Sequence, residues 1–395
     1  MDTFNVRNMA TRNPFIISGR IPDEFFCDRV DESRYLINKI EGQASNILLM
    51  ANRRIGKTGL IDFCFRRPEI DGEFYTFYFD ILHTSSLQEF VFEFGKEVYS
   101  RLIPKGQKLM QTLLQTVRSL NPKFSIDPFT GAPSFSLEIG SVSNPEYTLD
   151  EILKWLENAD RPCVVAIDEF QRIGRYPEKN VEALLRGKIQ HMDNCHFIFS
   201  GSEPHLLAEM FQSSKRPFYR STSTMELLAI EPEKYRAFAA YWFREGGRRL
   251  REEAFDAIYQ YFEGNTFCIQ QLLHEAYDRT DKGDICDRVV LTECLRNILA
   301  NNSNAYREML SRLTTKQKAV LTAIAIEGNA SKITSAAFLK RHQLESASMV
   351  QTALRILKGQ EWVSVRDNVY CLSDQLFSVW LRQQHGAEVT SFTFF

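Results

Sequence analysis

Residues Asn46–Phe63 read NILLMANRRIGKTGLIDF, and this stretch decides the fold. An apolar run typical of a buried strand leads through a basic loop into Gly56-Lys57-Thr58, and an apolar pattern typical of a helix follows. The start of a helix favours anions, because its first N–H groups lack partners within the helix and its dipole is positive at that end. The sequence therefore predicts a phosphate-binding loop.

The residues of this loop have separate predicted roles. Lys57 is expected to reach the β- and γ-phosphates of a nucleotide, and the Thr58 hydroxyl is expected to ligate Mg²⁺. The usual pattern G-x-x-x-x-G-K-[ST] starts with glycine, whereas Ala51 stands here; alanine fits if its backbone keeps ordinary φ and ψ angles. The alternative is a surface loop that contains GKT by chance. The predicted nucleotide-binding residues are Ala51, Asn52, Arg53, Arg54, Ile55, Gly56, Lys57, Thr58 and Gly59.

A second apolar run, VVAIDEF, ends in the carboxylates Asp168 and Glu169. Asp168 is predicted to hold Mg²⁺, directly or through water, and Glu169 to polarise an attacking water as the catalytic carboxylate. Acidic residues are common at strand ends, so this pair alone says little. Lys57 lies 111 residues before Asp168, and the two motifs together predict a nucleotide-hydrolysing site.

Two further side chains are predicted to act near the γ-phosphate. Ser202 follows the strand HFIFSGSE, where it could contact the phosphate or the water, with Ser200 as a competing candidate and a simple Ser-Gly-Ser turn as the alternative. Arg220 precedes another apolar stretch and is placed to sense or stabilise the γ-phosphate, unless it is an ordinary surface arginine. An N-K-x-D guanine motif is absent from the sequence, which favours ATP over GTP.

The 395 residues divide by pattern into several parts. Apolar strands that alternate with helices predict an α/β core with a parallel sheet buried on both faces. Helical spacing follows, and near the C-terminus three helices and the hairpin EWVSVRDNVYCL predict a winged helix-turn-helix. The expected boundaries are 1–230 for the core, 231–310 for the helical segment, 311–385 for the winged helix and 386–395 for a tail.

Charge and composition limit the partners. The formal net charge is −2, so DNA binding would need a local patch. Such a patch is expected on the second helix of the winged helix pair, through Gln351, Arg355 and Lys358, although this fold also serves as a protein-interaction module. Eight scattered cysteines, no apolar signal core and no run long enough to span a membrane predict a cytoplasmic protein without a membrane partner.

Five segments follow one another along the chain in the order found in a known protein family. They are NPF…PDEFFCDRVDE, ANRRIGKTGLID, VVAIDEFQRI, FIFSGSEPHLL and FYRSTSTMELL. In this the chain resembles the archaeal and bacterial ATPase family of the STAND branch of AAA+-like P-loop proteins, from about residue 13 to 385. The resemblance implies an ATPase core, a helical lid over residues 231–310 and a C-terminal winged helix, with Lys57, Thr58, Asp168 and Glu169 in the Walker roles. Two positions depart from the family pattern. They are Ala51 and, in a lid motif at Gly264–Thr266 that is implied to contact nucleotide, Thr266 in place of proline.

The leading functional hypothesis is an Mg²⁺-dependent ATPase with slow or partner-stimulated turnover. Its nucleotide state would control the binding of a partner, DNA or protein, by the winged helix, and a homo-oligomer is compatible with this. The alternative is a DNA-binding regulator that uses ATP as a ligand with little hydrolysis. A degenerate, purely structural P-loop protein is disfavoured, because Lys57, Thr58, Asp168 and Glu169 are all intact.

Overall fold

The computed structural model describes residues 12–42, 45–102, 123–126, 133–136, 142–366, 368–386 and 392. The chain forms two compact units. One is Arg29–Leu228, and the other is Ala229–Phe395 together with Met1–Asp28. Among the described residues, no helix combines the length and the apolar character needed to cross a bilayer.

The first unit contains a five-stranded sheet in the order β2-β5-β6-β1-β7, with every neighbouring pair parallel. Strands β1 and β5 are buried along nearly their whole length, which is why they read as continuous apolar runs. The predicted parallel sheet is confirmed. Its strands are β1 (Asn46–Ala51), β2 (Tyr75–Asp80), β5 (Cys163–Asp168), β6 (Cys195–Gly201) and β7 (Thr222–Leu227).

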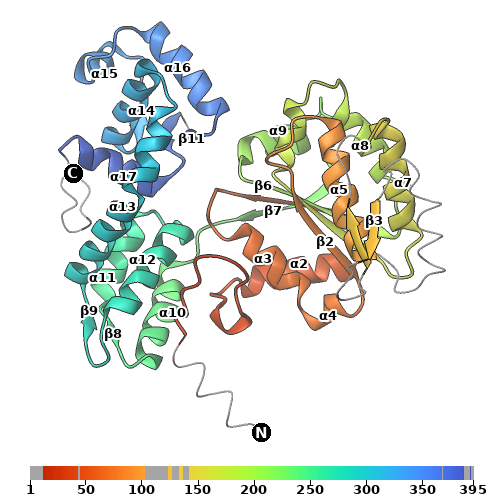
Figure 1. Ribbon diagram of the computed structural model, residues 1–395, viewed down its shortest axis with the longest axis horizontal. Coiled ribbons are helices and arrows are strands. Elements are labelled where there is room, and N and C mark those ends of the chain that lie inside the picture. The colour runs from red at the N-terminus through yellow and green to blue at the C-terminus, as the bar shows by residue number, and fades with distance from the viewer. Residues whose placement is uncertain are drawn as a thin grey trace. The chain divides into compact units, whose positions relative to one another are not determined.

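Helices cover both faces of this sheet (Figure 1). One group consists of α2 (Val30–Glu41), α3 (Lys57–Phe65) and α4 (Pro68–Asp71). The other consists of α5 (Leu87–Leu102), α7 (Pro145–Glu157), α8 (Val181–Ile189) and α9 (Pro204–Gln212), with the short 3₁₀ helix η4 (Phe170–Arg175). A separate antiparallel pair is formed by β3 (Lys123–Ile126) and β4 (Pro133–Ser136).

Strand register brings the predicted site residues to one edge of the sheet. Asp168 pairs with Asp80, and Met50, just before the phosphate-binding loop, pairs with Gly201. The carboxyl ends of parallel strands all lie on the same side of the sheet, which is where ligands bind in open α/β sheets. The loop after β1 and the carboxylates after β5 therefore face the same space, with the end of β6 between them.

The second unit begins with four helices and a two-stranded sheet. The helices are α10 (Pro232–Glu245), α11 (Glu252–Tyr261), α12 (Thr266–Arg279) and α13 (Arg288–Ser311). The strands β8 (Arg249–Leu250) and β9 (Ile285–Cys286) pair in parallel. Sequence patterning missed these strands, because two residues are too few to show a strand period.

The predicted winged helix is confirmed in the same unit. Its helices are α14 (Thr315–Glu327), α15 (Ala336–Arg341) and α16 (Ala347–Gly359), and its hairpin is β11 (Val363–Arg366) with β12 (Val369–Leu372). The structure adds the short strand β10 (Ala330–Ser331) and a final helix, α17 (Gln375–Gln384). Helix α17 packs the Trp380 ring 5.5 Å from that of Tyr306 in α13, which ties the winged helix to the preceding helices.

The described N-terminal lead-in, residues 12–28, packs with the helices of the second unit. The Phe15 side chain is fully buried, with ring centroids 6.2 Å from Phe238, 5.6 Å from Phe243 and 5.8 Å from Tyr277. The Asn13 amide donates to the carbonyl of His274 over 2.9 Å. The predicted division at residue 230 assigned this segment to the core, whereas its packing joins it to helices that begin more than 200 residues later.

Replacing Phe15 by alanine is expected to destabilise the second unit by about 3 kcal/mol, because it opens a cavity among three aromatic rings. Urea unfolding followed by tryptophan fluorescence measures the change. Ile17→Ala is the matched control, since Ile17 is 41% exposed in the same segment, and it should shift stability by less than about 1 kcal/mol. Equal effects of the two variants would contradict the anchoring role of Phe15.

Candidate functional site

The predicted phosphate-binding loop joins β1 to α3. Ala51 is the last residue of β1 and has an ordinary extended backbone, so alanine is accommodated there. Gly56 has a φ of 97°, in the region that side chains other than glycine rarely adopt. Helix α3 begins at Lys57, and no side chain among the described residues caps it. Its first N–H donors therefore suit a phosphate group.

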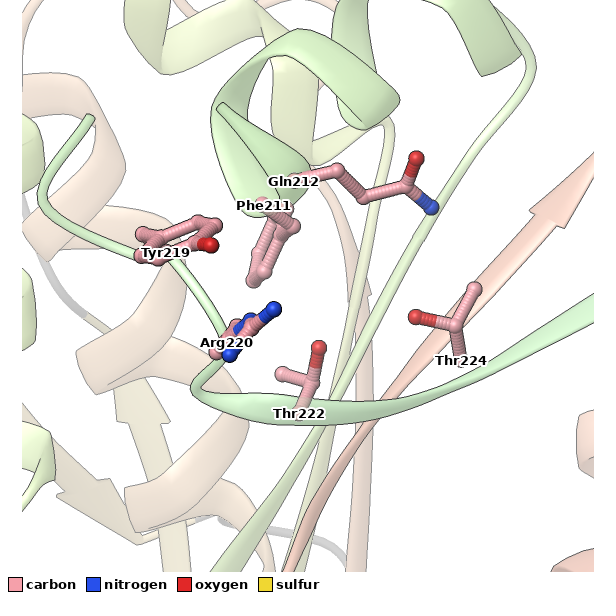
Figure 2. A pocket seen from close by; sticks show the side chains of 6 residues that line it. All are labelled: Phe211, Gln212, Tyr219, Arg220, Thr222 and Thr224. Carbon is pink, nitrogen blue, oxygen red and sulfur yellow. The ribbon is translucent and has the colours of Figure 1, made fainter. Parts of the chain in front are cut away.

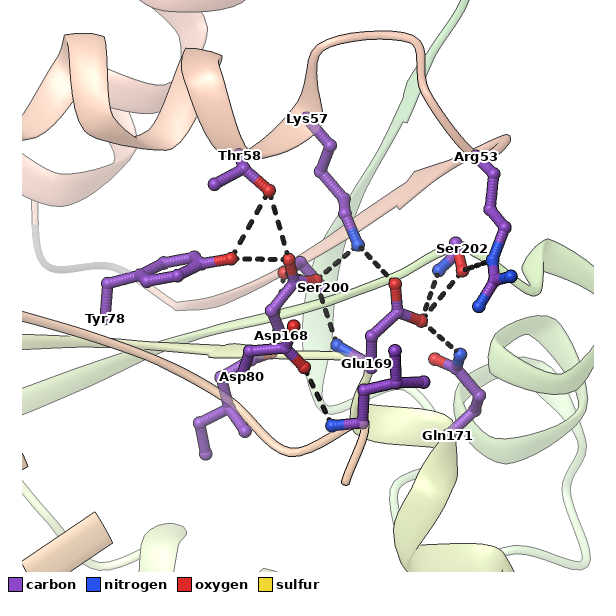
Figure 3. A network of polar contacts seen from close by, with 12 residues as sticks. Arg53, Lys57, Thr58, Tyr78, Asp80, Asp168, Glu169, Gln171, Ser200 and Ser202 are labelled. Carbon is purple, nitrogen blue, oxygen red and sulfur yellow. Dashed lines mark hydrogen bonds and ion pairs between the residues drawn. The ribbon is translucent and has the colours of Figure 1, made fainter. Parts of the chain in front are cut away.

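Lys57 joins the two predicted carboxylates (Figure 3). Its Nζ contacts Oδ1 of Asp168 and lies 3.6 Å from Oε1 of Glu169. All three side chains are buried, so a cation and two carboxylates share a space with little solvent. The structure thus brings together residues that lie 111 positions apart in the chain.

Asp168 is the centre of this network. Its Oδ1 also accepts from Ser200 Oγ (2.8 Å) and from the N–H of Glu169 (2.9 Å). Its Oδ2 accepts from Tyr78 Oη (2.7 Å) and Thr58 Oγ1 (3.3 Å). Burial by itself would raise the pKa of Asp168, but the Lys57 ammonium and the neighbouring hydroxyls lower it below its usual value.

The donor set of Thr58 and Asp168 fits magnesium. A hydroxyl and a carboxylate are hard oxygen donors, the kind that Mg²⁺ prefers, and both belong to the predicted metal-ligand pair. The carboxylate stays ionised, because its pKa is lowered. These two residues would hold the ion beside the loop.

Glu169 is held in one orientation by neighbouring donors. Its backbone has a left-handed φ of 58°, and its Oε2 accepts from the N–H (3.2 Å) and hydroxyl (2.8 Å) of Ser202. The Ser202 hydroxyl also lies 3.3 Å from Nε of Arg53 in the loop. Ser202 therefore lies beside the candidate catalytic carboxylate, whereas Ser200 contacts Asp168, and the predicted contact of Ser202 with phosphate or water stays a prediction.

Two residues of the site escaped sequence reasoning. Gln171 donates to Oε2 of Glu169 over 2.6 Å and is 1% exposed. Tyr78 lies opposite Ala166, two positions before Asp168, so both side chains project from the same face of the sheet. Burial and the adjacent Asp168 raise the pKa of Tyr78, which keeps its hydroxyl a donor. Strand register alone could have found the Tyr78 contact, whereas Gln171 follows Glu169 by two residues within the quoted segment VVAIDEFQRI and was given no role there.

The prediction for Arg220 needs correction. The residue precedes β7, whose Thr222 pairs with Asn46 at the start of β1. Arg220 therefore lies at the amino ends of the strands, whereas the loop lies at their carboxyl ends. The separation is roughly 16 Å, five residues of strand. Arg220 instead lines a pocket with Phe211, Gln212, Tyr219, Thr222 and Thr224 (Figure 2). It does not join Lys57 within this chain, because strand direction places the two at different ends.

The departure at Thr266 has a local explanation. Gly264 has a φ of 71°, and the Asn265 side chain caps α12 by accepting from the N–H of Cys268 over 3.1 Å. Thr266 is the first residue of α12, where proline is favoured but not required, since that N–H has no partner within the helix. The helix start is therefore preserved without the proline.

Gly201 provides the space that Gln171 occupies, and this gives a test. A Cβ at Gly201 would lie 2.0 Å from Oε1 of Gln171, so Gly201→Ala must displace the amide and break its hydrogen bond to Glu169. We expect a loss of about 1–3 kcal/mol in unfolding free energy, measured by chemical denaturation. Gly187→Ala, where a Cβ meets no described atom within 4 Å, should cost nothing. An unchanged stability of Gly201→Ala would show that Gln171 has room to move.

Comparisons with known proteins agree with this geometry. The family described as "ATPase domain predominantly from Archaea" matches residues 26–272, and that described as "probable winged helix domain" matches residues 304–383. No curated protein matches the chain.

Solved structures share the fold. The chain is similar to a Walker-type ATPase of Pyrococcus abyssi, with 20% identity, a TM-score of 0.62, and coverage of 93% of this chain and 99% of that chain. It is also similar to the ORC2 protein of Aeropyrum pernix in ADPNP-ADP complexes, with 14% identity, a TM-score of 0.56, and coverage of 95% of this chain and 98% of that chain. A third similar structure is the ORC1 protein of Aeropyrum pernix in complex with DNA. Its identity is 14% and its TM-score 0.54, with coverage of 94% of this chain and 96% of that chain. Because the first family match spans more than half of the sequence and includes the whole site around Lys57 and Asp168, the chain belongs to the family of ATPase domains found predominantly in Archaea.

Proposed function

We propose that this protein binds ATP with magnesium, hydrolyses it slowly, and uses its nucleotide state as a switch. One observation carries the proposal. At the start of α3, which no described side chain caps, Lys57 lies between Asp168, a candidate magnesium ligand, and Glu169, a candidate base. Family membership supports nucleotide binding in general. Hydrolysis, the magnesium dependence and the switch are the parts that we infer.

Binding of phosphate is expected to redistribute the contacts of Lys57. Its ammonium is now paired with Asp168 and Glu169, and a phosphate oxygen would offer an equivalent anionic partner. The N–H donors at the start of α3 would hold the same group. The exchange keeps the buried cation compensated, so its cost is small.

In hydrolysis, Glu169 would take a proton from the attacking water. The water oxygen bonds to the γ-phosphorus, and the bond from that phosphorus to the oxygen of the departing ADP breaks. Ser202 and Gln171 would orient the Glu169 carboxylate through the hydrogen bonds that they already make. Magnesium, held by Thr58 and Asp168, would neutralise phosphate charge when bound.

The connection between the units supports the proposed switch. The chain passes between them at Asp28–Arg29 and at Leu228–Ala229. Asp28 and Arg29 both have a left-handed φ, 56° and 66°. The buried Arg29 guanidinium donates over 3.1 Å to the carbonyl of Ile55 in the phosphate-binding loop. A change in the conformation of the loop would therefore act, through Arg29, on the connection at Asp28–Arg29, whose backbone is strained.

Two variants test the ATPase assignment. Lys57→Ala is expected to abolish the rise in melting temperature that ATP and Mg²⁺ give to the wild type, because the phosphates lose their cation. Glu169→Gln should keep that rise but lose at least about 100-fold in turnover, since the amide cannot take the proton. Phosphate release and thermal unfolding are the measurements.

Lys188→Ala is the matched control, because Lys188 in α8 pairs with Asp150 in α7 and not with a residue of the site, so its loss should change neither readout. Turnover that survives in both site variants would refute the assigned roles. Binding by the wild type without turnover would favour the alternative, a regulator that uses ATP as a ligand.

DNA contact through the winged helix is the second candidate function. Residues 311–386 contain ten Lys and Arg against five Asp and Glu, a formal charge of +5 in a chain whose total is −2. Gln351, Arg355 and Lys358 are exposed along α16. In the described part of the chain, neither Arg355 nor Lys358 takes part in an ion pair, so both are available for phosphates. That the ORC1 protein of the same fold is described with DNA makes the proposal reasonable.

Replacing Arg355 and Lys358 by alanine together should weaken binding to duplex DNA and reduce the slope of log affinity against log salt by about 2. Fluorescence anisotropy at several salt concentrations measures this slope. Lys316→Ala is the control, because Lys316 already pairs with Glu345 over 2.7 Å and should contribute little. An unchanged slope in the double variant would leave protein contact as the role of this face.

A further inference from the structure

The two predicted magnesium ligands, Thr58 and Asp168, both contact the hydroxyl oxygen of Tyr78. Thr58 Oγ1 and Asp168 Oδ2 lie 3.3 Å apart, and Tyr78 Oη lies 3.3 Å from the first and 2.7 Å from the second (Figure 3). Adjacent oxygens in an octahedral magnesium shell stand roughly 3.0 Å apart, given Mg–O distances near 2.1 Å. The tyrosine hydroxyl is thus spaced from both ligands as a neighbouring oxygen of the shell would be.

Asp168 has no spare acceptor position for a metal or a metal-bound water. A carboxylate has about four lone-pair sites, and its two oxygens here receive donors from Lys57, Ser200, the Glu169 N–H, Tyr78 and Thr58. On Oδ2, which faces Thr58, the shorter of the two hydrogen bonds comes from Tyr78. Any new partner of Oδ2 must therefore displace a donor, and Tyr78 is the one outside the loop motif.

Tyr78 can leave without disturbing the sheet. Its backbone pairs with Ala166 in the ladder between β2 and β5, and its N–H is 3.3 Å from a carboxylate oxygen of Glu97 in α5. Strand β2 is at the edge of the sheet, and the tyrosine side chain is only partly buried. Rotation of the side chain alone would release Asp168 while the strand stays in place.

We propose that the Tyr78 hydroxyl is a built-in competitor of magnesium at Asp168. It holds the carboxylate oxygen that faces Thr58, and it gives up that hydrogen bond when magnesium enters with the nucleotide. This inference rests on the proposed ATP–magnesium function. Its consequence is that Tyr78 sets the magnesium concentration at which the protein binds nucleotide tightly, and that its ring changes orientation as it does so.

Tyr78→Phe tests the proposal because it removes the hydroxyl and keeps the ring. Calorimetric titrations with ATP would be made in EDTA and over a series of Mg²⁺ concentrations. We expect the Mg²⁺ concentration that gives half of the gain in affinity to fall about tenfold, as the loss of one competing charge-assisted hydrogen bond predicts. Affinity in EDTA should stay within about twofold of the wild type.

Tyr75→Phe is the matched control, since it removes another hydroxyl from β2, one that contacts Asp160 over 3.1 Å at the opposite end of the strand. It should leave the magnesium dependence unchanged, and thermal unfolding would confirm that both variants are folded. A higher Mg²⁺ requirement in Tyr78→Phe would make Tyr78 a supporting residue and overturn the proposal, as would an unchanged one. If the wild type bound no ATP at any Mg²⁺ concentration, the proposed function itself would fail, and this inference with it.

Discussion

The buried carboxylate of Asp168 is the charge on which the rest of the site depends. An ionised group without compensation is very costly to bury, so the fold must bring donors to it from several elements. Lys57 and Thr58 come from the start of α3, Tyr78 from β2 and Ser200 from β6. The loop, β5 and both of its neighbouring strands are therefore held together by one side chain, and any ligand must enter by exchanging partners within this network.

The strand between the two motifs supplies the second half of the network. Because β6 lies between β1 and β5, its end places Ser200 beside Asp168 and Ser202 beside Glu169. Gly201 separates these serines and leaves the room in which Gln171 reaches Glu169. Three consecutive residues thus serve three different purposes, two as donors and one as space. A turn of Ser-Gly-Ser is also the simplest local interpretation of those letters, and only the strand order distinguishes the two.

The second unit combines a charge pattern with a packing pattern. Its winged helix concentrates positive charge that the whole chain does not show, because acidic residues elsewhere offset it. The helices before it take the N-terminal lead-in into their core through Phe15. The chain therefore enters the first unit at Arg29 from a segment anchored elsewhere, and Arg29 in turn contacts the phosphate-binding loop. This hydrogen bond lies within the first unit, directly beside the covalent connection to the second.

The sequence by itself determined the parallel sheet, the winged helix and the core of the site. Lys57 and Asp168 could be predicted because loop chemistry, helix starts and buried strands leave short, periodic patterns in neighbouring residues. The tertiary structure decided which distant side chains meet. Tyr78 belongs to the site and Arg220 does not, although the sequence predicted Arg220 there. Strand order and register, set by packing across the whole sheet, determine which residues lie at the same end of the strands. No local pattern contains that information, since it arises from contacts between segments far apart in the chain.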